Sequence, residues 1–266
     1  MVNKGIYYLT PDCEPTENMA VDEWLFHRIQ YNSLPVATIL RLYSWKIPAI
    51  TIGYNQDENR AVNTALLDKN LPIIRRITGG RAIYHDPGEI TFSISINTAR
   101  LSNASDSLSA INQLISESVV AALNKVGIKA VWARASDHNF ASTSRGRLKA
   151  CFMSLSRHEI ISGTSKIAAG AQRRIGPFLI HQGSIKINGI SPCPAIGQTE
   201  EHSDRIHPGI VSADGRPHLH DFSPAFLKSF EEVMKISFEQ ASISTDERSD
   251  LDKFRKMVAI NGLARR

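Results

Sequence analysis

The sequence predicts an α+β fold in which a mixed, mostly antiparallel sheet is covered by helices. Two patterns carry this prediction. Residues 90–96 alternate between apolar and polar side chains, as in a half-buried strand. Residues 108–126 place apolar side chains at steps of three and four, as in an amphipathic helix. Segments of both kinds are interleaved along the chain, so we expect one domain over residues 1–266.

The first half of the chain predicts one helix and three strands. Thr16 can cap a helix that ends near Ile29, because its side-chain oxygen can accept from a backbone amide of the first turn. Pro48 lies in a turn between the first two strands. Gly79 and Gly80 precede the third strand and predict a tight turn, since glycine adopts positive φ without steric cost. The three strands are expected over residues 38–45, 49–54 and 90–96.

The second half predicts three helices and four strands. The first helix begins near Asp106 and ends at Gly127. Ser223 can cap the next helix, with Pro224 at its first position, and a charged terminal helix is expected at about 245–266. The strands are expected over 128–131, 157–161, 166–172 and 178–187, with a tight turn at 163–164 and loops over 136–149 and 188–222.

The composition indicates a globular protein. Of the 266 residues, 42% are hydrophobic and 21% are charged. No run approaches the ~20 apolar residues that a membrane helix requires, and the first residues lack the pattern of a secretory signal. The three cysteines, Cys13, Cys151 and Cys193, lie too far apart for a disulfide framework, and no His/Cys cluster has zinc spacing. We therefore expect a cytoplasmic location, no membrane association and no bound metal.

The charge balance bears on possible partners. The net charge of +5 and the 7% of scattered aromatic residues do not form the dense basic and aromatic pattern of a nucleic-acid binder. A mild positive field would help to steer an acidic protein partner. We therefore expect no nucleic-acid binding.

The most informative segment is R-R-I-T-G-G-R-A-I-Y-H-D at residues 75–86. Its arginines offer planar forks for carboxylate or phosphate oxygens. Its glycines let backbone amides approach a ligand closely. A Gly-Gly pair alone is typical of an ordinary turn, but the whole string is more specific. The segment therefore predicts a binding site for an acidic or polar-headed substrate.

This segment resembles the R-R-x-[ST]-G-G-[GR]-A-x-x-H-D signature of the biotin/lipoate protein ligase superfamily. Other segments resemble motifs of the same superfamily, in the same order along the chain. They are N-M-A-V-D-E at 18–23, R-L-Y-S-W at 41–45 with P-A-I-T-I-G at 48–53 (a hairpin in the family), S-K-I-A-A-G-A-Q at 165–172, and F-L-I-H-Q-G-S-I at 178–185. The resemblance implies the class II biotin/lipoate ligase-like catalytic fold.

Lys166 is the first candidate catalytic residue that the resemblance implies. Strand lysines are most often solvated, but small residues flank this one, so a ligand could lie along the backbone. In the family this lysine polarises the acyl carbonyl and stabilises developing negative charge. His85 and His181 are candidate general bases or positioning groups. The expected substrate-binding residues are Arg76, Gly79, Gly80, Arg81, His85, Gly170, Ala171, Gln172, His181 and Gly183.

Cys151 distinguishes between two reactions. Residues 150–160 resemble the A-C-F-x-x-x-S-x-x-E-[IL] segment of cysteine-dependent octanoyltransferases, in which the cysteine becomes acylated. A thiolate near Lys166 and arginines could have a lowered pKa, which suits a nucleophile. A buried, inert thiol is the alternative interpretation. Cys193 is a rival nucleophile because its context resembles the P-C-G cysteine of a second octanoyltransferase branch, although the glycine is missing here; Cys13 has no expected role.

These residues favour ping-pong octanoyl transfer that requires no cofactor. Octanoyl-acyl carrier protein would acylate Cys151, and a lysine of a lipoyl domain or of the glycine-cleavage carrier protein would then accept the octanoyl group. The main alternative is an ATP-dependent lipoate–protein ligase, which would use ATP and Mg²⁺ to form lipoyl-adenylate. A non-catalytic carrier-binding protein is a further alternative, which the combination of Lys166, Cys151 and the Gly-Gly turn disfavours. A biotin ligase is disfavoured because its G-R-G-R-x-G-type loop is absent.

Overall fold

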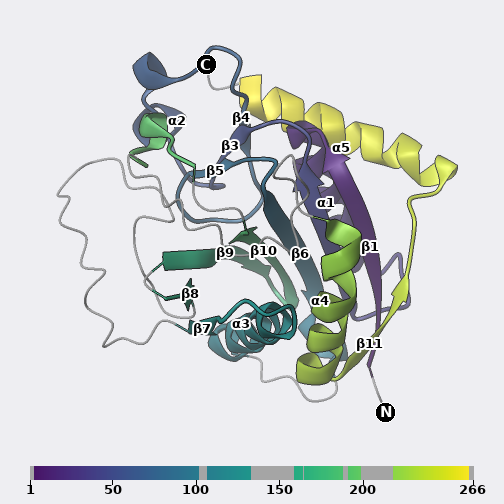
Figure 1. Ribbon diagram of the computed structural model, residues 1–266. Coiled ribbons are helices and arrows are strands. Elements are labelled where there is room, and N and C mark those ends of the chain that lie inside the picture. The colour runs from purple at the N-terminus through teal and green to yellow at the C-terminus, as the bar shows by residue number, and fades with distance from the viewer. Residues whose placement is uncertain are drawn as a thin grey trace.

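The computed structural model describes residues 3–101, 107–132, 159–163, 165–187, 191–198 and 218–263. Its helices cover a large sheet, and a small sheet packs near one end (Figure 1). The α-helices are α1 (Pro15–Gln30), α2 (Glu58–Ala61), α3 (Leu108–Lys125), α4 (Leu219–Met234) and α5 (Thr245–Leu263), with 3₁₀ turns at Thr64–Leu66, Thr98–Arg100 and Pro194–Ile196.

The strands form an eight-stranded and a three-stranded sheet. The large sheet runs, in spatial order, through β11 (Ile236–Gln240), β1 (Asn3–Cys13), β2 (Thr38–Trp45), β6 (Glu89–Asn97), β10 (Phe178–Lys186), β9 (Ser165–Ile175), β8 (Ile160–Ser162) and β7 (Val131–Trp132). The small sheet has the order β4 (Ile73–Arg75), β3 (Ala49–Ile52) and β5 (Ile83–His85).

The pairing pattern confirms the predicted fold class. In the large sheet, β1 pairs in parallel with β11 and β2, whereas every pairing from β2 to β7 is antiparallel. In the small sheet, β3 pairs in parallel with β4 and antiparallel with β5. The protein is thus an α+β fold with a mostly antiparallel sheet.

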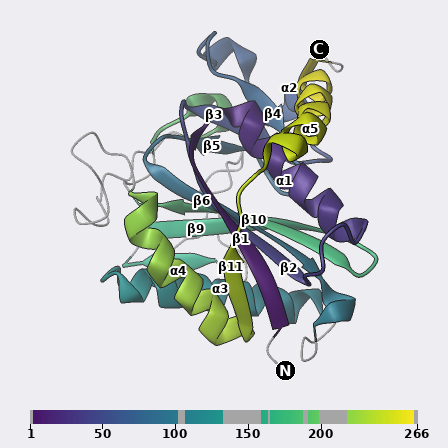
Figure 2. The same cartoon turned by 90° about the vertical axis from the view of Figure 1, so that its right-hand side faces the viewer.

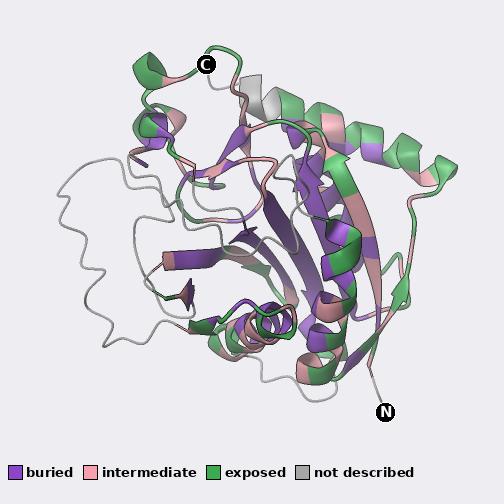
Figure 3. Ribbon diagram, viewed as in Figure 1, coloured by how far each residue is buried: buried purple, intermediate pink, exposed green. Residues whose placement is uncertain are grey.

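The two faces of the large sheet differ in chemistry. One face carries Leu40, Phe92, Ile94 and other apolar side chains against α3 and α4. The other face packs against α1, and α5 packs in turn against α1 (Figure 2). Its strand β6 presents Thr91, Ser93 and Ser95, all buried. Side chains alternate between faces along a strand, so one β6 sequence serves both layers. Figure 3 shows the sheet strands as largely buried and the outer surfaces of the helices as exposed.

A buried ion pair organises the polar face. The Arg41 guanidinium donates to Asp22 at 2.8 Å, and both side chains are fully buried. Arg41 also donates to Asn18 and Thr10. Asp22 accepts further bonds from Tyr43 and Ser93. Charged groups are buried at low cost only when their donors and acceptors are paired in this way. The ion pair therefore joins α1 to β2 and β6.

Most predicted elements are confirmed, with small shifts of their ends. The predicted cap at Thr16 is wrong, because helix α1 begins one residue earlier, at Pro15, with Glu14 at the N-cap position and no side-chain cap. Strand β2 has the predicted bounds, and Gly127, with φ of +87°, follows α3 as predicted. Strand β7 lies one to three residues later than expected, because Ile128 and Ala130 pack in the core without strand pairing. Residues 136–149 and most of 188–222 lie outside the described residues.

The expected hairpin of strands 38–45 and 49–54 is wrong. Strand β2 belongs to the large sheet, whereas β3 belongs to the small one. Each strand finds partners that are distant in sequence: β2 pairs with β1 and β6, and β3 with β4 and β5. The turn at Pro48 therefore carries the chain from one sheet to the other.

The predicted cap at Ser223 is also wrong, because α4 begins at Leu219 and contains Pro224. A proline within a helix leaves the carbonyl four residues earlier without its usual donor. Here that carbonyl belongs to His220, and the Ser223 hydroxyl donates to it at 3.3 Å. The serine thus compensates for the proline and lets the helix start earlier.

The buried ion pair predicts a large stability effect. Replacing Asp22 by alanine leaves the Arg41 charge buried without its carboxylate, so we expect the free energy of unfolding to fall by about 3–5 kcal/mol. Urea unfolding measures this change. Asp252→Ala is the control, because Asp252 pairs with Arg255 on the surface of α5 and should cost about 1 kcal/mol or less. Equal losses in the two variants would contradict a central role for Asp22.

Candidate active site

The Gly-Gly turn lies directly on strand β9. Gly80 has φ of +89°, a backbone conformation that favours glycine. A Cβ at this position would lie 3.2 Å from the Cβ of Ala171 on β9. Gly79 has more room, since a Cβ there would meet nothing closer than the Gln172 carbonyl oxygen at 3.9 Å. The structure therefore brings together four of the predicted substrate-binding residues.

The two arginines before the turn hold two neighbouring stretches of backbone in place. Arg75 donates to the carbonyl oxygens of Gly53 and Gln56 at 2.9 and 2.6 Å. Arg76 is buried and donates to the carbonyl oxygens of Gly79 and Arg81 at 2.6 and 2.8 Å. The Arg76 guanidinium therefore shapes the turn, whereas the Arg75 guanidinium holds residues 53–56. The Arg81 side chain, in contrast, is exposed beside it.

A buried glutamine connects the turn to the polar face of the large sheet. Thr78 donates through its hydroxyl to Gln182 Oε1 at 2.7 Å. Gln182 in turn donates through Nε2 to Asp22 Oδ2 at 2.6 Å. This chain of hydrogen bonds fixes the turn relative to β10 and α1. The sequence motifs assigned no role of their own to Thr78, Gln182 and Asp22, although each of these residues lies in one of the motifs.

Lys166 lies in strand β9 and its side chain is buried. Its ammonium Nζ is 2.6 Å from Glu159 Oε1, and the two side chains are 2% and 11% exposed. Five residues further along β9 is Ala171, a separation of roughly 16 Å along the strand. Between them, Ala168, Ala169 and Gly170 are small, and the larger Ile167 packs in the apolar core.

His85 belongs to a second buried network, centred on Glu89. Its Nδ1 lies 2.6 Å from Glu89 Oε1 and its Nε2 lies 2.7 Å from the Thr51 hydroxyl. Its ring stacks on Trp45 with a centroid distance of 4.1 Å. Burial lowers the pKa of His85, and the Glu89 carboxylate only partly opposes this effect. Both ring nitrogens are held by protein groups, so the geometry suits a positioning role.

Glu89 stays ionised within this network. Burial alone would raise its pKa, but the charges of Lys186 and His85 and their hydrogen bonds outweigh burial and lower the pKa to about 2. Lys186 pairs with Glu89 and also donates to the Tyr84 carbonyl oxygen at 2.7 Å. Ser184 and Thr91 donate to Glu89 as well. The network thus attaches β5 to β6 and β10.

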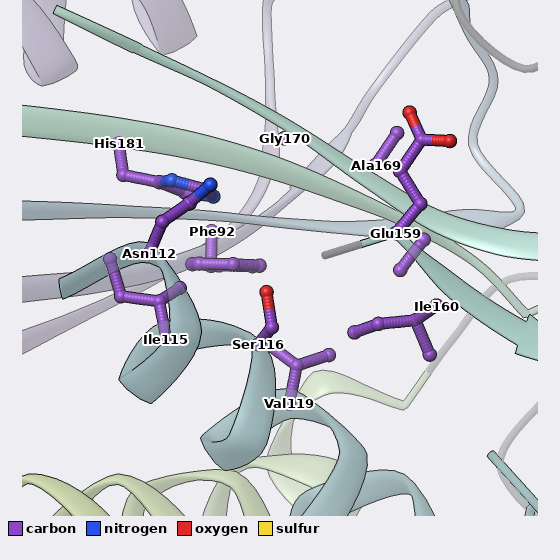
Figure 4. Close-up of a pocket in the computed structure, with 11 residues that line it drawn as sticks. Phe92, Asn112, Ile115, Ser116, Val119, Glu159, Ile160, Ala169, Gly170 and His181 are labelled. Carbon is purple, nitrogen blue, oxygen red and sulfur yellow. The ribbon is translucent and has the colours of Figure 1, made fainter. Parts of the chain in front are cut away.

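His181 lies on the other face of the sheet. Its neighbour Gln182 reaches the turn, and alternation along β10 directs His181 the opposite way, where it stacks on Phe92. His181 lines a cavity of about 60 Å³ between β9, β10 and α3, which also contains Asn112 and Ser116 (Figure 4). Within the described residues, His181 Nδ1 and Asn112 Oδ1 have no hydrogen-bond partner.

The predicted set of substrate-binding residues is therefore divided between two faces. Gly170 pairs with Gly183, and both point to the face of His181. A Cβ on Gly170 would clash with His181 Nε2, and one on Gly183 would clash with the Phe92 ring. These two glycines make room for aromatic rings. Adjacent residues of a strand point to opposite faces of the sheet. The sequence positions of His181 and Gln182 could therefore have shown that their side chains lie on different faces.

The two candidate cysteines differ in what the structure describes. Cys151 lies outside the described residues. Cys193 is buried in the core of the small sheet with Ile50, Ile52 and Ala82. Burial raises the pKa of the Cys193 thiol, which disfavours the thiolate that a nucleophile requires. Within the described part of the chain, no three His, Cys, Asp or Glu side chains gather as they would around a metal ion. No described helix is long and apolar enough to cross a membrane.

Comparison with known proteins identifies the class of this chain. The family described as "Lipoyl protein ligase A/B catalytic domain" matches residues 14–192. This span covers well over half of the chain, so the chain belongs to that family.

More specific relatives are octanoyltransferases. The octanoyltransferase LipM of Kyrpidia tusciae is 32% identical over 249 residues, which cover 89% of each chain. LipM of Oceanobacillus iheyensis is 28% identical over 242 residues, covering 86% of this chain and 85% of the relative. Among solved structures, a lipoate-protein ligase A bound with ATP superimposes with a TM-score of 0.66 at 22% identity, covering 96% of this chain and 95% of that one. The bi-partite lipoate protein ligase of Thermoplasma acidophilum gives a TM-score of 0.65 at 19% identity, covering 96% and 92%. These structures share the fold.

The close approach of Gly170 to His181 predicts a steric effect. Gly170→Ala places a methyl group against the His181 ring and 3.3 Å from the Gln182 carbonyl oxygen. We expect the free energy of unfolding to fall by about 1–3 kcal/mol because the packed strands must shift. Gly79→Ala is the control, since its added Cβ has nothing closer than 3.9 Å and should change stability by about 0.5 kcal/mol or less. A neutral Gly170→Ala would argue against this packing.

The buried imidazole of His181 predicts a loss of stability in mild acid. Burial lowers its pKa from 6.5 to about 4, so between these values the unfolded chain binds more protons than the folded one. The free energy of unfolding should therefore fall as pH drops from about 7 to about 4.5, by about 2–3 kcal/mol. His181→Gln, which removes this titration, should fall correspondingly less.

Urea unfolding at the two pH values tests this expectation. The window avoids Glu89, whose lowered pKa of about 2 makes its contribution disappear only below about pH 4.5. Parallel pH profiles for wild type and His181→Gln would contradict a neutral, buried His181.

Proposed function

We propose that this protein is an octanoyltransferase that works through an acyl-thioester on Cys151. The observation that carries the proposal is the 32% identity to an octanoyltransferase LipM over 89% of both chains. Membership of the lipoyl protein ligase A/B family supports a lipoyl-domain lysine as the acceptor. The donor in this proposal is octanoyl-acyl carrier protein, and no cofactor takes part.

The proposed reaction has two balanced steps. First, the Cys151 sulfur attacks the thioester carbonyl of the donor, a new C–S bond forms, and the carrier thiol leaves with the proton that Cys151 gives up. Next, the uncharged amine of the acceptor lysine attacks the acyl-enzyme, a C–N bond forms, the C–S bond to Cys151 breaks, and the proton lost by nitrogen returns to the Cys151 sulfur. Both steps pass through a tetrahedral oxyanion, which a fixed cation stabilises.

Lys166 is the cation that suits this role. Its side chain is buried and its ammonium is held by Glu159, so its charge acts in a site with little water, where electrostatic stabilisation is strong. The small residues of β9 and the Gly-Gly turn would line the path of the octanoyl chain. Support for this path comes from the close approach of Gly80 to Ala171. Glycine has no side chain and alanine has only a methyl group, so neither residue blocks the strand surface.

The test mixes the full-length protein with octanoyl-acyl carrier protein and an apo lipoyl domain, without ATP. Wild type should transfer octanoate and show a mass increase that peptide mapping locates on Cys151. Cys151→Ala should lose both transfer and adduct, because burial raises the thiol pKa of both described cysteines, Cys13 and Cys193. Lys166→Ala should slow adduct formation about 100- to 1000-fold, the usual cost of removing an oxyanion-stabilising group.

Two cysteine controls accompany this experiment. Cys13→Ala should leave transfer unchanged, since Cys13 lies in the first strand, where its sulfur donates to the carbonyl oxygens of Thr10 and Pro11. Cys193→Ala should still form the adduct. Transfer that requires ATP and Mg²⁺ and survives in Cys151→Ala would refute the transferase and favour an adenylating ligase. An adduct on Cys193 would show that Cys193, and not Cys151, is the nucleophile.

A further inference from the structure

The contact between Glu159 and Lys166 connects the start of β8 to β9, the strand that pairs with it. Glu159 directly precedes β8, and Lys166 is the second residue of β9. Between these strands the register shifts, with Ile160 opposite Ala168 but Ile161 opposite Lys166. The shift brings the two charged groups to 2.6 Å although seven positions separate them.

The direction of the Glu159 side chain is informative. Glu159 contributes to the wall of the cavity that His181 lines. Its carboxylate nevertheless lies beside Ala169, on the opposite side of this cavity from His181 and Asn112 (Figure 4). The carboxylate therefore binds the Lys166 ammonium, and the rest of the Glu159 side chain lines the cavity.

Physical chemistry gives this ion pair a specific consequence. A lysine side chain has four carbons and many rotamers, and its ammonium is a compact charge without preferred direction. Ordering such a side chain costs conformational entropy. A buried carboxylate at hydrogen-bond distance fixes the ammonium before any ligand arrives. Because an ammonium has three donors, a bond to Glu159 is compatible with a bond to a substrate carbonyl.

We propose that Glu159 is a positioning residue for the acyl-transfer reaction, which holds the Lys166 ammonium where the oxyanion forms. This inference rests on the proposed function. Glu159 acts through Lys166 and does not touch the reacting atoms. Misplacing a catalytic group by about 1 Å can cost about 100-fold in rate, so loss of the carboxylate should lower the rate constant and leave donor binding nearly unchanged.

The experiment measures single-turnover acylation of the full-length protein by octanoyl-acyl carrier protein at several donor concentrations. Glu159→Ala should slow the maximal rate of Cys151 adduct formation about 10- to 100-fold, with the half-saturating donor concentration within about twofold of wild type. Glu159→Gln keeps an oxygen acceptor at the same place and should recover part of this loss. The matched control is Glu232→Ala, which removes an exposed carboxylate paired with Lys125 and should react like wild type.

A double variant separates positioning from a general structural role. In a Lys166→Ala background, adding Glu159→Ala should change the rate by about twofold or less, because Glu159 then has no ammonium to hold. The double variant also removes the Lys166 charge that Glu159→Ala leaves without its Glu159 carboxylate, so it keeps the test informative if Glu159→Ala alone folds poorly. Circular dichroism and urea unfolding accompany each rate.

Three outcomes would overturn the proposal. Glu159→Ala could react at the wild-type rate, could raise only the half-saturating donor concentration, or could multiply the loss already caused by Lys166→Ala. Failure of the proposed function looks different, because wild type itself would then form no adduct on Cys151. The expected rates in all five variants would support the positioning role of Glu159.

Discussion

The carboxylate of Asp22 is the interaction on which the central part of this molecule depends. It is fully buried and accepts from Arg41, Tyr43, Ser93 and Gln182. An ion pair of this kind adds little net stability compared with well-packed apolar groups, but losing one partner is costly. Its effect is therefore to select one arrangement of α1, β2, β6 and β10. Through Gln182 and Thr78 the same arrangement reaches the Gly-Gly turn.

A second network, centred on Glu89, fixes the opposite part of the same face. It contains His85, Thr91, Ser184 and Lys186. Together the two networks satisfy the polar groups of the sheet face with protein partners. The turn and strand β9 are consequently placed before a substrate binds. Such preorganisation is what electrostatic catalysis requires, because polar groups that must reorient during reaction lose much of their effect.

The sequence predicted the long, strongly patterned elements and missed the short or weakly patterned ones. Strand β6 alternates over nine residues and α3 keeps its apolar stripe over five turns, so both were found. Strands β4 and β5 have only three residues each, too few to show a period. Strand β1 has half-buried and exposed positions through most of its length, and β11 likewise, so neither alternates clearly.

The remaining errors concern tertiary partners. Nothing local to residues 38–54 states that β2 and β3 enter different sheets, since each pairing is formed with distant segments. For the site, the motif identified the Gly-Gly turn and Lys166 but gave no roles to Asp22, Gln182 and Glu159. Their contacts span 160 residues in one case and seven in another. Such contacts follow from packing, which residue spacing alone does not contain.

The proposed reaction requires groups that are fixed before the substrate binds, and the structure contains such groups. Transfer of an acyl group from a thioester to an amine is thermodynamically downhill, so the enzyme need not activate the acyl group with a nucleotide. It needs instead a fixed positive charge and an unobstructed strand along which the chain can lie. The Lys166–Glu159 pair offers the first. The small residues of β9, held against the turn at Gly80, offer the second. Cys193 lies in the core of the small sheet, where burial raises its thiol pKa, so it is poorly suited to be the nucleophile of the proposed reaction.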